Sequence, residues 1–164
     1  MKKNLPGKKE LNLIGLGTYN LKGKECESIV KEAIKIGYRH IDTAKIYENE
    51  KSIGKAIAKS KIDRKDLFIT SKIAINTKNQ EIENQLKKSL SDLNTKYLDL
   101  FLIHWPLFET NLFDVLKILA YLKKQTLIRN YGVSNFNCAL LKECNKLGHK
   151  IYCNQIEYHP FIKQ

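Results

Sequence analysis

The sequence of 164 residues has little of what marks fibrous, disordered or membrane proteins. It contains only 3 Pro and 8 Gly, too few for a collagen-like or low-complexity chain. No apolar run approaches the roughly 20 residues that a membrane-spanning helix needs. The basic N-terminus is not followed by the apolar stretch of a secretory signal peptide. We therefore expect a cytoplasmic protein that does not associate with membranes.

Cysteine is also sparse and irregularly placed. The four cysteines form no C-x-x-C pair and show no metal-ligand spacing with the four histidines; they are Cys26, Cys138, Cys144 and Cys153. In the absence of an export signal we expect them to be reduced thiols, and we expect no metal site.

Arginine is scarce although the chain is strongly basic. Lys and Arg number 29 against 17 Asp and Glu, a formal net charge of +12, but only Arg39, Arg64 and Arg129 are arginines. Arginine is the side chain that binds phosphate through two parallel hydrogen bonds and that reads guanine, so its scarcity argues against specific nucleic-acid binding. A solvated, lysine-rich surface is the favoured interpretation, and loose polyanion binding stays as an alternative.

Short apolar runs alternate with amphipathic segments along the chain. The apolar runs predict six β-strands, at 14–19, 39–43, 67–73, 98–105, 128–133 and 151–157. Apolar residues at helical spacing predict five helices, at 25–36, 49–60, 80–93, 113–124 and 138–147. Strands separated by helices of this length pair in parallel through right-handed crossovers. We expect one α/β domain over residues 1–164, with no linker.

Two parallel folds compete at this point. A doubly wound sheet needs a phosphate-binding loop after its first strand, but residues 15–20 read GLGTYN, with Asn20 where the third glycine should stand. A TIM (β/α)8 barrel needs eight strands and about 250 residues, more than this chain has. The side chains at the strand ends have to decide between the two folds.

Four ionisable residues fall at the carboxyl ends of successive predicted strands or in the loop that follows; they are Asp42, Tyr47, Lys72 and His104. In a barrel, these strand ends build the active site. The four residue types suit carbonyl reduction, because a tyrosine can protonate the alkoxide that hydride addition leaves. A neighbouring ammonium lowers the pKa of the tyrosine, a carboxylate holds that ammonium, and a histidine donates to the carbonyl oxygen.

Six motifs occur in the order of the N-terminal part of an aldo-keto reductase: GLGTY (15–19), GYRHIDTAKIYENE (37–50), ITSK (69–72), LFLIHWP (100–106), GVSNF (132–136) and NQIEYHP (154–160). The chain resembles this family from about Leu11 onwards. The resemblance implies an incomplete TIM (β/α)8 barrel with about six strands and five intervening helices. It also implies NADP(H) as the cofactor, a small-molecule carbonyl substrate, and reduction of aldehydes and ketones to alcohols.

The resemblance further implies individual roles. Tyr47 is expected to be the general acid, with a pKa lowered by Lys72, and the full catalytic set is Asp42, Tyr47, Lys72 and His104. The residues expected at the cofactor are Thr18, Tyr19, Asp42, Ser134, Asn135 and Gln155. The residues expected at the substrate are Tyr19, Tyr47, His104 and Trp105.

Plainer interpretations stay open for most of these residues. Asp42 and Lys72 could form a plain structural ion pair. His104 could be a hydrogen-bonded histidine of the core, and Tyr47 could be an ordinary tyrosine without a catalytic role. The remaining residues with a plainer interpretation are Tyr19 and Trp105, as packing aromatics, and Ser134 and Asn135, as caps of the helix that follows.

The sequence ends seven residues after the last predicted strand, before the last two β/α units of a family barrel. By the resemblance, those units would supply a tyrosine that stacks on the nicotinamide, a basic cluster for the 2′-phosphate and a substrate-selecting loop. Six strands leave the first and the sixth as open edges, and we expect apolar side chains of the interior to face water. We expect weak or no activity unless a complementary C-terminal fragment completes the barrel; a non-catalytic remnant or subunit is the alternative.

Overall fold

The computed structural model describes residues 2–3, 11–12, 14–106 and 111–162. Six parallel strands form one sheet in the order in which they occur along the chain: β3 (Leu16–Gly17), β4 (His40–Asp42), β5 (Phe68–Ile73), β6 (Leu98–Ile103), β7 (Ile128–Ser134) and β8 (Asn154–Gln155). Two further short strands, β1 (Lys2–Lys3) and β2 (Leu11–Asn12), pair antiparallel. A doubly wound sheet reverses its strand order, so the unbroken order from β3 to β8 confirms the barrel type.

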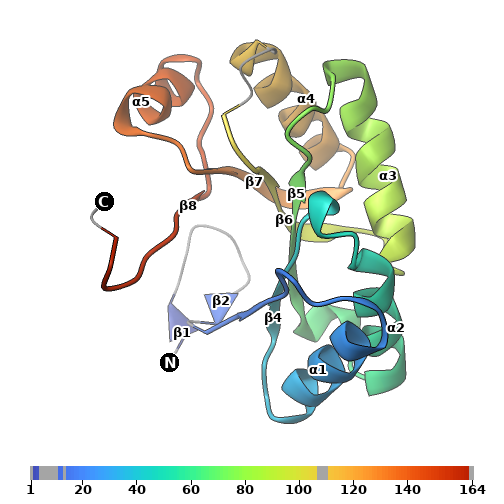
Figure 1. The fold of residues 1–164 in the computed structure, drawn as a ribbon. Helices are drawn as coiled ribbons and strands as arrows, with labels where there is room; N and C mark the ends of the chain where they lie inside the picture. Colours follow the sequence, from blue (N-terminus) through green and yellow to red (C-terminus); the bar gives the residue numbers. More distant parts are fainter. Residues whose placement is uncertain (1, 4–10, 13, 107–110, 163–164) are drawn as a thin grey trace.

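Helices between the strands cover the outer face of the curved sheet (Figure 1). They are α1 (Gly23–Lys35), α2 (Glu50–Ser60), α3 (Ile82–Asp92), α4 (Leu112–Lys124) and α5 (Cys138–Lys146). One-turn 3-10 helices precede α2, β5 and α3: η1 (Lys45–Tyr47), η2 (Arg64–Asp66) and η3 (Asn79–Glu81). The five predicted helices and the order of the six predicted strands are confirmed, although the first and the sixth strand are shorter than predicted; the 3-10 turns and the β1–β2 pair were not predicted. None of the helices in the described part of the chain has the length and apolar character that a membrane crossing requires.

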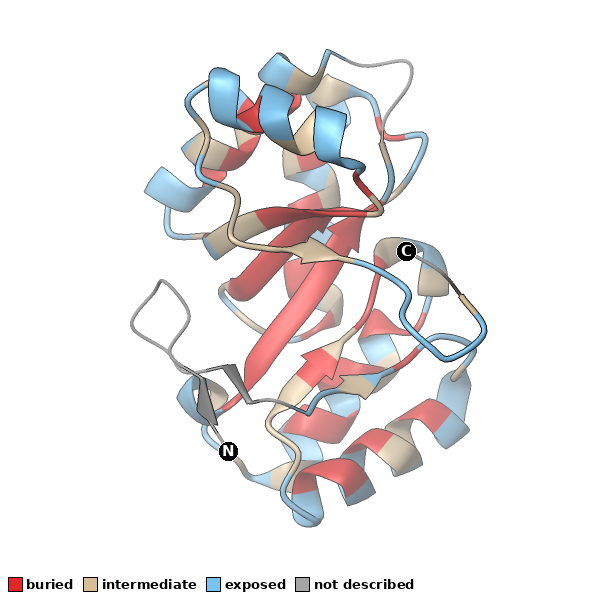
Figure 2. Cartoon of the chain, turned by 90° about the vertical axis from the view of Figure 1, so that its left-hand side faces the viewer, coloured by how far each residue is buried: buried red, intermediate tan, exposed pale blue. Residues whose placement is uncertain are grey.

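The main hydrophobic core lies between the sheet and the helices. Along β5, alternate residues such as Ile69 and Ile73 are fully buried and pack with apolar side chains of α1, α2 and α3. Figure 2 shows the same pattern, with buried residues along the strands and on one side of each helix. Gly37 and Gly148 end α1 and α5 with φ values of 110° and 78°, a backbone conformation that side chains other than glycine rarely adopt.

A smaller apolar cluster fills the inner, concave side of the sheet. Phe68, Leu100 and Leu102 are buried there, packed against Tyr152 and Cys153. The expectation that interior apolar side chains face water is therefore wrong, because the segment before β8 folds over them. A glycine at 132 permits this approach, since a Cβ at that position would lie 2.6 Å from the Cys153 carbonyl oxygen.

The sheet is strongly curled. Four strand spacings separate β4 from β8, which in a flat sheet would be about 19 Å. Nevertheless the Nε2 atom of Gln155, in β8, donates a hydrogen bond of 2.9 Å to Oδ2 of Asp42, in β4. Within the described residues, β3 and β8 each pair with a strand on one side only. The chain thus forms an incomplete barrel of six strands and five helices, as the sequence predicts.

Candidate active site

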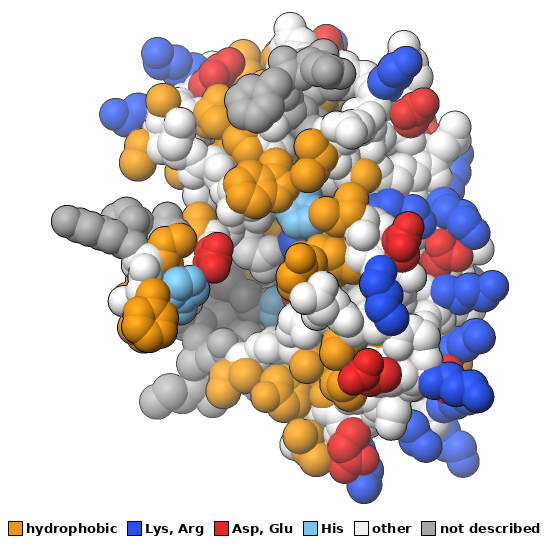
Figure 3. Space-filling view, viewed as in Figure 1, with side chains coloured by type: hydrophobic (Ala, Val, Ile, Leu, Met, Phe, Trp, Pro, Cys, Tyr) orange, Lys and Arg blue, Asp and Glu red, His pale blue; other side chains and the backbone are white. Residues whose placement is uncertain are grey.

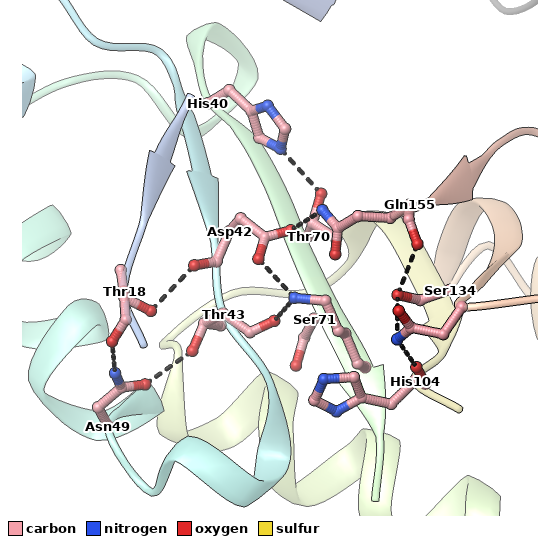
Figure 4. A network of polar contacts seen from close by, with 12 residues as sticks. Thr18, His40, Asp42, Thr43, Asn49, Thr70, Ser71, His104, Ser134 and Gln155 are labelled. Atoms are coloured by element: carbon pink, nitrogen blue, oxygen red, sulfur yellow. Dashed lines mark hydrogen bonds and ion pairs between the residues drawn. The ribbon is translucent and has the colours of Figure 1, made fainter. Parts of the chain in front are cut away.

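The structure brings the four predicted ionisable residues together. Lys72 projects from β5 and donates hydrogen bonds to Oδ1 of Asp42 and, at 2.9 Å, to the carbonyl oxygen of Thr43. The ring of Tyr47, at the end of η1, lies with its centroid 5.3 Å from the Lys72 nitrogen and 5.7 Å from the His104 ring. Asp42, in β4, and His104, which follows β6, point into the same region from either side of β5 (Figure 4). Four residues from four different segments therefore share one mouth of the barrel.

Strand geometry places these side chains on the inner face. Thr70 and Lys72 are two residues apart in β5, and His40 and Asp42 are two residues apart in β4, so each pair shares a face of the sheet. Asp42 pairs in register with Thr70, and the His40 ring lies 3.0 Å from the Thr70 hydroxyl, one layer below the charged pair. The interior is therefore layered, with Asp42 and Lys72 above His40 and Thr70.

Lys72 is a buried ammonium with a fixed partner. Its exposed fraction is 1%, and burial lowers its pKa below the usual lysine value even though the Asp42 carboxylate attracts the charge. Asp42 is held from the other side by the amide of Gln155. The ion pair is therefore fixed in position by strands β4, β5 and β8 together.

The pKa of Tyr47 is shifted in the direction opposite to the one expected from the sequence. Burial, together with the nearby Asp42 and Tyr19, raises the pKa of Tyr47 to about 12. The predicted lowering by Lys72 is therefore wrong: burial is the largest cause of the shift, and it makes the phenol a weaker acid. At neutral pH the phenol is protonated and keeps a proton available for transfer.

His104 is buried but is not a hydrogen-bonded core histidine. Its exposed fraction is 7%, and its Nδ1 atom has no hydrogen-bond partner among the described residues. Burial and the positive charge of Lys72 lower the pKa of His104 to about 4, with Asp42 opposing them. The ring is therefore neutral at physiological pH and carries one N–H that can be donated.

Two aromatic side chains stand at the rim of the site. Tyr19 is 69% exposed and packs its ring edge-to-face on Tyr47 at 5.2 Å between centroids, and Trp105 is 46% exposed. Such exposure excludes a role as core-packing aromatics. Figure 3 shows apolar side chains gathered around a hollow on this side, while Lys and Arg gather over the helices.

Polar residues at the end of β7, just after it and in β8 form a connected group beside His104. The Ser134 hydroxyl donates to the Gln155 carbonyl oxygen at 2.9 Å. The Asn135 amide donates to the Ser134 oxygen at 3.1 Å and to the His104 carbonyl oxygen at 3.0 Å. Capping is not their role, because Asn137 is the N-cap of α5 and its side chain accepts from the backbone of Leu140.

The sequence analysis missed a clamp that joins the loops around the site. The Asn49 side chain accepts a hydrogen bond of 2.7 Å from the Thr43 hydroxyl and donates to the carbonyl oxygens of Thr18, at 2.8 Å, and Leu21, at 3.1 Å. The Thr18 hydroxyl in turn donates to the Asp42 carbonyl oxygen at 2.9 Å. The loops after β3 and β4 are therefore tied together. Asn49 lies inside the GYRHIDTAKIYENE motif, where only the start of a helix was predicted.

Chemically, the mouth offers a protonated phenol, a neutral imidazole and a buried ammonium–carboxylate pair. Among the described residues, no group of three or more His, Cys, Asp or Glu is arranged to hold a metal ion. The amide and hydroxyl groups of Ser134, Asn135 and Gln155 lie next to this set and can bind an amide ligand.

Comparisons with known proteins place the chain in a family. The model of the "Aldo/keto reductase family" matches residues 13–164. Methylglyoxal reductase DkgB of Escherichia coli O157:H7 is 42% identical over 154 residues, which are 91% of this chain and 58% of that protein. Glyoxal reductase of Bacillus subtilis (strain 168) is 43% identical over 160 residues, 94% of this chain and 57% of that protein.

Solved structures agree. The crystal structure of an aldo/keto reductase from Brucella melitensis superimposes with a TM-score of 0.91 at 36% identity, over 100% of this chain and 65% of that one. This chain spans a little over half the length of the curated relatives that it matches. With the family model matching nearly all of its residues, the chain belongs to the aldo/keto reductase family.

Proposed function

We propose that this chain supplies the proton-donating part of an NADP(H)-dependent reductase that converts aldehydes and ketones to alcohols. The observation that carries the proposal is the meeting of Tyr47, Lys72, Asp42 and His104 at one mouth of the sheet. The printed names of two relatives, a methylglyoxal reductase and a glyoxal reductase, favour small 1,2-dicarbonyl compounds as substrates. The residues proposed at the substrate are Tyr19, Tyr47, His104 and Trp105.

The residues beside the tetrad fit a nicotinamide. A carboxamide presents one acceptor and two N–H donors, and so needs partners of both kinds. Ser134, Asn135 and Gln155 supply hydroxyl and amide groups, and neither side-chain carbonyl oxygen of the two amides accepts a hydrogen bond from the described residues. The residues that would hold the cofactor are Thr18, Tyr19, Asp42, Ser134, Asn135 and Gln155. When bound, the reduced nicotinamide supplies a hydride.

The proton chemistry follows from the states of the side chains. The neutral His104 ring donates its N–H to the substrate carbonyl oxygen and polarises it. Tyr47 then gives its phenolic proton to the oxygen as an alkoxide develops there. An alkoxide is a far stronger base than a phenolate, so proton transfer to it from the Tyr47 phenol is downhill, even though burial raises the pKa of that phenol to about 12. The tyrosinate that remains is stabilised by the Lys72 ammonium, which Asp42 holds in place.

We also propose that a complementary polypeptide of two β/α units is needed for full activity. Two features support this: β3 and β8 are open edges within the described residues, and the curated relatives are longer than this chain. Completion by two strands gives the eight that close a TIM barrel. Without them, binding and orientation of the cofactor are incomplete, and these account for a large part of an enzyme's rate.

The test is a titration of the purified 164-residue chain with NADPH, followed by a methylglyoxal reduction assay with and without the C-terminal β/α units of DkgB. We expect little binding or turnover by the chain alone and restoration by the added units. Tyr47→Phe should then lower kcat by about 10²- to 10⁴-fold, whereas Tyr121→Phe, on the exposed side of α4, should leave kcat unchanged. Micromolar NADPH binding by the isolated chain would refute the need for a partner, and full activity of Tyr47→Phe would refute the role of Tyr47.

A further inference from the structure

The turn that carries Tyr47 has little backbone support of its own. In η1 the Tyr47 N–H donates to the Ala44 carbonyl oxygen at 3.0 Å and the Glu48 N–H to that of Lys45 at 3.2 Å. Glu48 then leaves the turn in a left-handed conformation, with φ at 54°. A single turn of 3-10 helix has poor hydrogen-bond geometry and is weak alone. The position of the Tyr47 ring must therefore depend on side-chain contacts made by the turn.

Lys45, two residues before Tyr47, makes such a contact. Its Nζ atom lies 3.2 Å from a carboxylate oxygen of Glu50, in α2, and 3.2 Å from one of Asp92, at the end of α3. Although burial disfavours the charged form, the two carboxylates outweigh it and raise the pKa of Lys45. The ammonium is therefore charged and joins η1 to two helices. On the exposed side, Lys22 donates to the Tyr47 carbonyl oxygen at 2.7 Å.

Glu50 extends this link to the sheet. It is only 3% exposed, and its second carboxylate oxygen accepts a hydrogen bond of 2.7 Å from the hydroxyl of Ser71. Ser71 precedes Lys72 in β5, and successive residues of a strand point to opposite faces. The cluster of Lys45, Glu50, Asp92 and Ser71 thus lies behind the strand whose front carries Lys72.

A close helix contact brings Asp92 within reach. A Cβ atom at Gly54, in α2, would lie 2.4 Å from the backbone oxygen of Asp92, so only glycine permits this spacing of α2 and α3. Lys88 also donates to Asp92, at 3.0 Å, and fixes its second oxygen. The anchor for Lys45 is therefore built into the packing of the helices and is not a chance surface pair.

We infer that Lys45 is a positioning residue for Tyr47, tying the η1 turn through Glu50 and Asp92 to the back of strand β5. The inference rests on the proposed function, in which Tyr47 donates the proton. Lys45 contacts no reactant: it holds the backbone from which the phenol projects toward His104. Loss of the link should let the turn move away from His104 while the barrel interior stays intact.

The test is nuclear magnetic resonance of the 164-residue chain with labelled aromatic rings. In Lys45→Met, the nuclear Overhauser effect between the Tyr47 and His104 rings should fall several-fold. The effect between His40 and Phe68, whose centroids are 5.0 Å apart inside the barrel, should persist. Lys51→Met is the matched control: it removes one exposed lysine charge from the first turn of α2 and should change neither signal.

Lys45→Arg is the conservative rescue, because a guanidinium can also bridge two carboxylates, and it should restore the Tyr47–His104 signal. An unchanged Tyr47–His104 effect in Lys45→Met would overturn the inference. Loss of both effects would also overturn it, since Lys45 would then support the whole fold and not the turn. The measurement needs no turnover, so it decides on Lys45 separately from Tyr47→Phe, which decides on the proposed function.

Discussion

Replacing Lys72 by methionine should destabilise the fold severely. Methionine has a similar length and no charge, so it fills the space of the lysine but leaves the Asp42 carboxylate with the Gln155 amide as its remaining described side-chain partner. Lys72 is almost fully buried, and Asp42 is also largely shielded from water. Breaking a buried ion pair by removing one partner costs about 3–5 kcal/mol, because the other charge stays buried without compensation.

The assay is urea unfolding at pH 7, followed by circular dichroism, with the m-value checked for constancy. Lys65→Met is the matched control: Lys65 lies 2.9 Å from Asp63, but both side chains are exposed, so loss of this pair should leave the free energy of unfolding nearly unchanged. The double variant Lys72→Met/Asp42→Asn removes both charges and should recover much of the stability that Lys72→Met loses.

A cost below about 1 kcal/mol for Lys72→Met would refute this reasoning, because exposed ion pairs are worth that much. The same holds if the double variant is less stable than Lys72→Met alone. Either result would mean that water screens the Asp42 carboxylate, and the proposed stabilisation of a tyrosinate by a desolvated ammonium would lose its basis.

Three further outcomes are expected from the same unfolding assay. The pKa of His104 is about 4 in the folded chain and 6.5 in the unfolded chain, so the unfolded chain binds more protons between these two pH values. The free energy of unfolding should therefore fall as the pH drops from 6.5 to 4, and it should fall less in His104→Asn. Gly54→Ala should cost about 1–3 kcal/mol, since the added carbon meets backbone and forces α2 away from α3; no loss would mean that the helices separate freely. Asp99→Asn should cost about 1–3 kcal/mol, because the buried carboxylate forms an ion pair with Arg64 at 2.8 Å and accepts a hydrogen bond from Arg129 at 3.3 Å. A neutral result would show that these arginines need no counter-charge.

Elements in the middle of the chain were predictable from the sequence because both faces of their strands are buried. β5 and β6 are buried along their whole length, and the observed bounds fall within the predicted ones. The edges were overestimated: the runs at 14–19 and 151–157 contain only two-residue strands, β3 and β8. A strand is defined by its hydrogen-bonded partner, and within the described residues each edge strand has one neighbour only. Hydrophobicity alone does not reveal a missing neighbour.

The candidate site was predictable where its residues lie at the carboxyl ends of predicted parallel strands, because these ends meet at one mouth of the barrel. Asp42, Lys72 and His104 follow that rule directly. Their titration does not, because the pKa of Tyr47 depends on how deeply the folded chain buries it. The link from Lys45 to Asp92 was not predictable either, since it joins residues 47 positions apart through the packing of two helices.

The hydrogen bond from Gln155 to Asp42 has a consequence for how the barrel and its chemistry depend on each other. Asp42 divides its two oxygens between the ammonium of Lys72 and an amide of the edge strand β8. If a polypeptide docked along β8 and shifted this strand by a fraction of an ångström, it would change the hydrogen bond from Gln155 to the Asp42 carboxylate. Through the Gln155 side chain, the position of the edge strand β8 is therefore coupled to the environment of the Asp42–Lys72 ion pair.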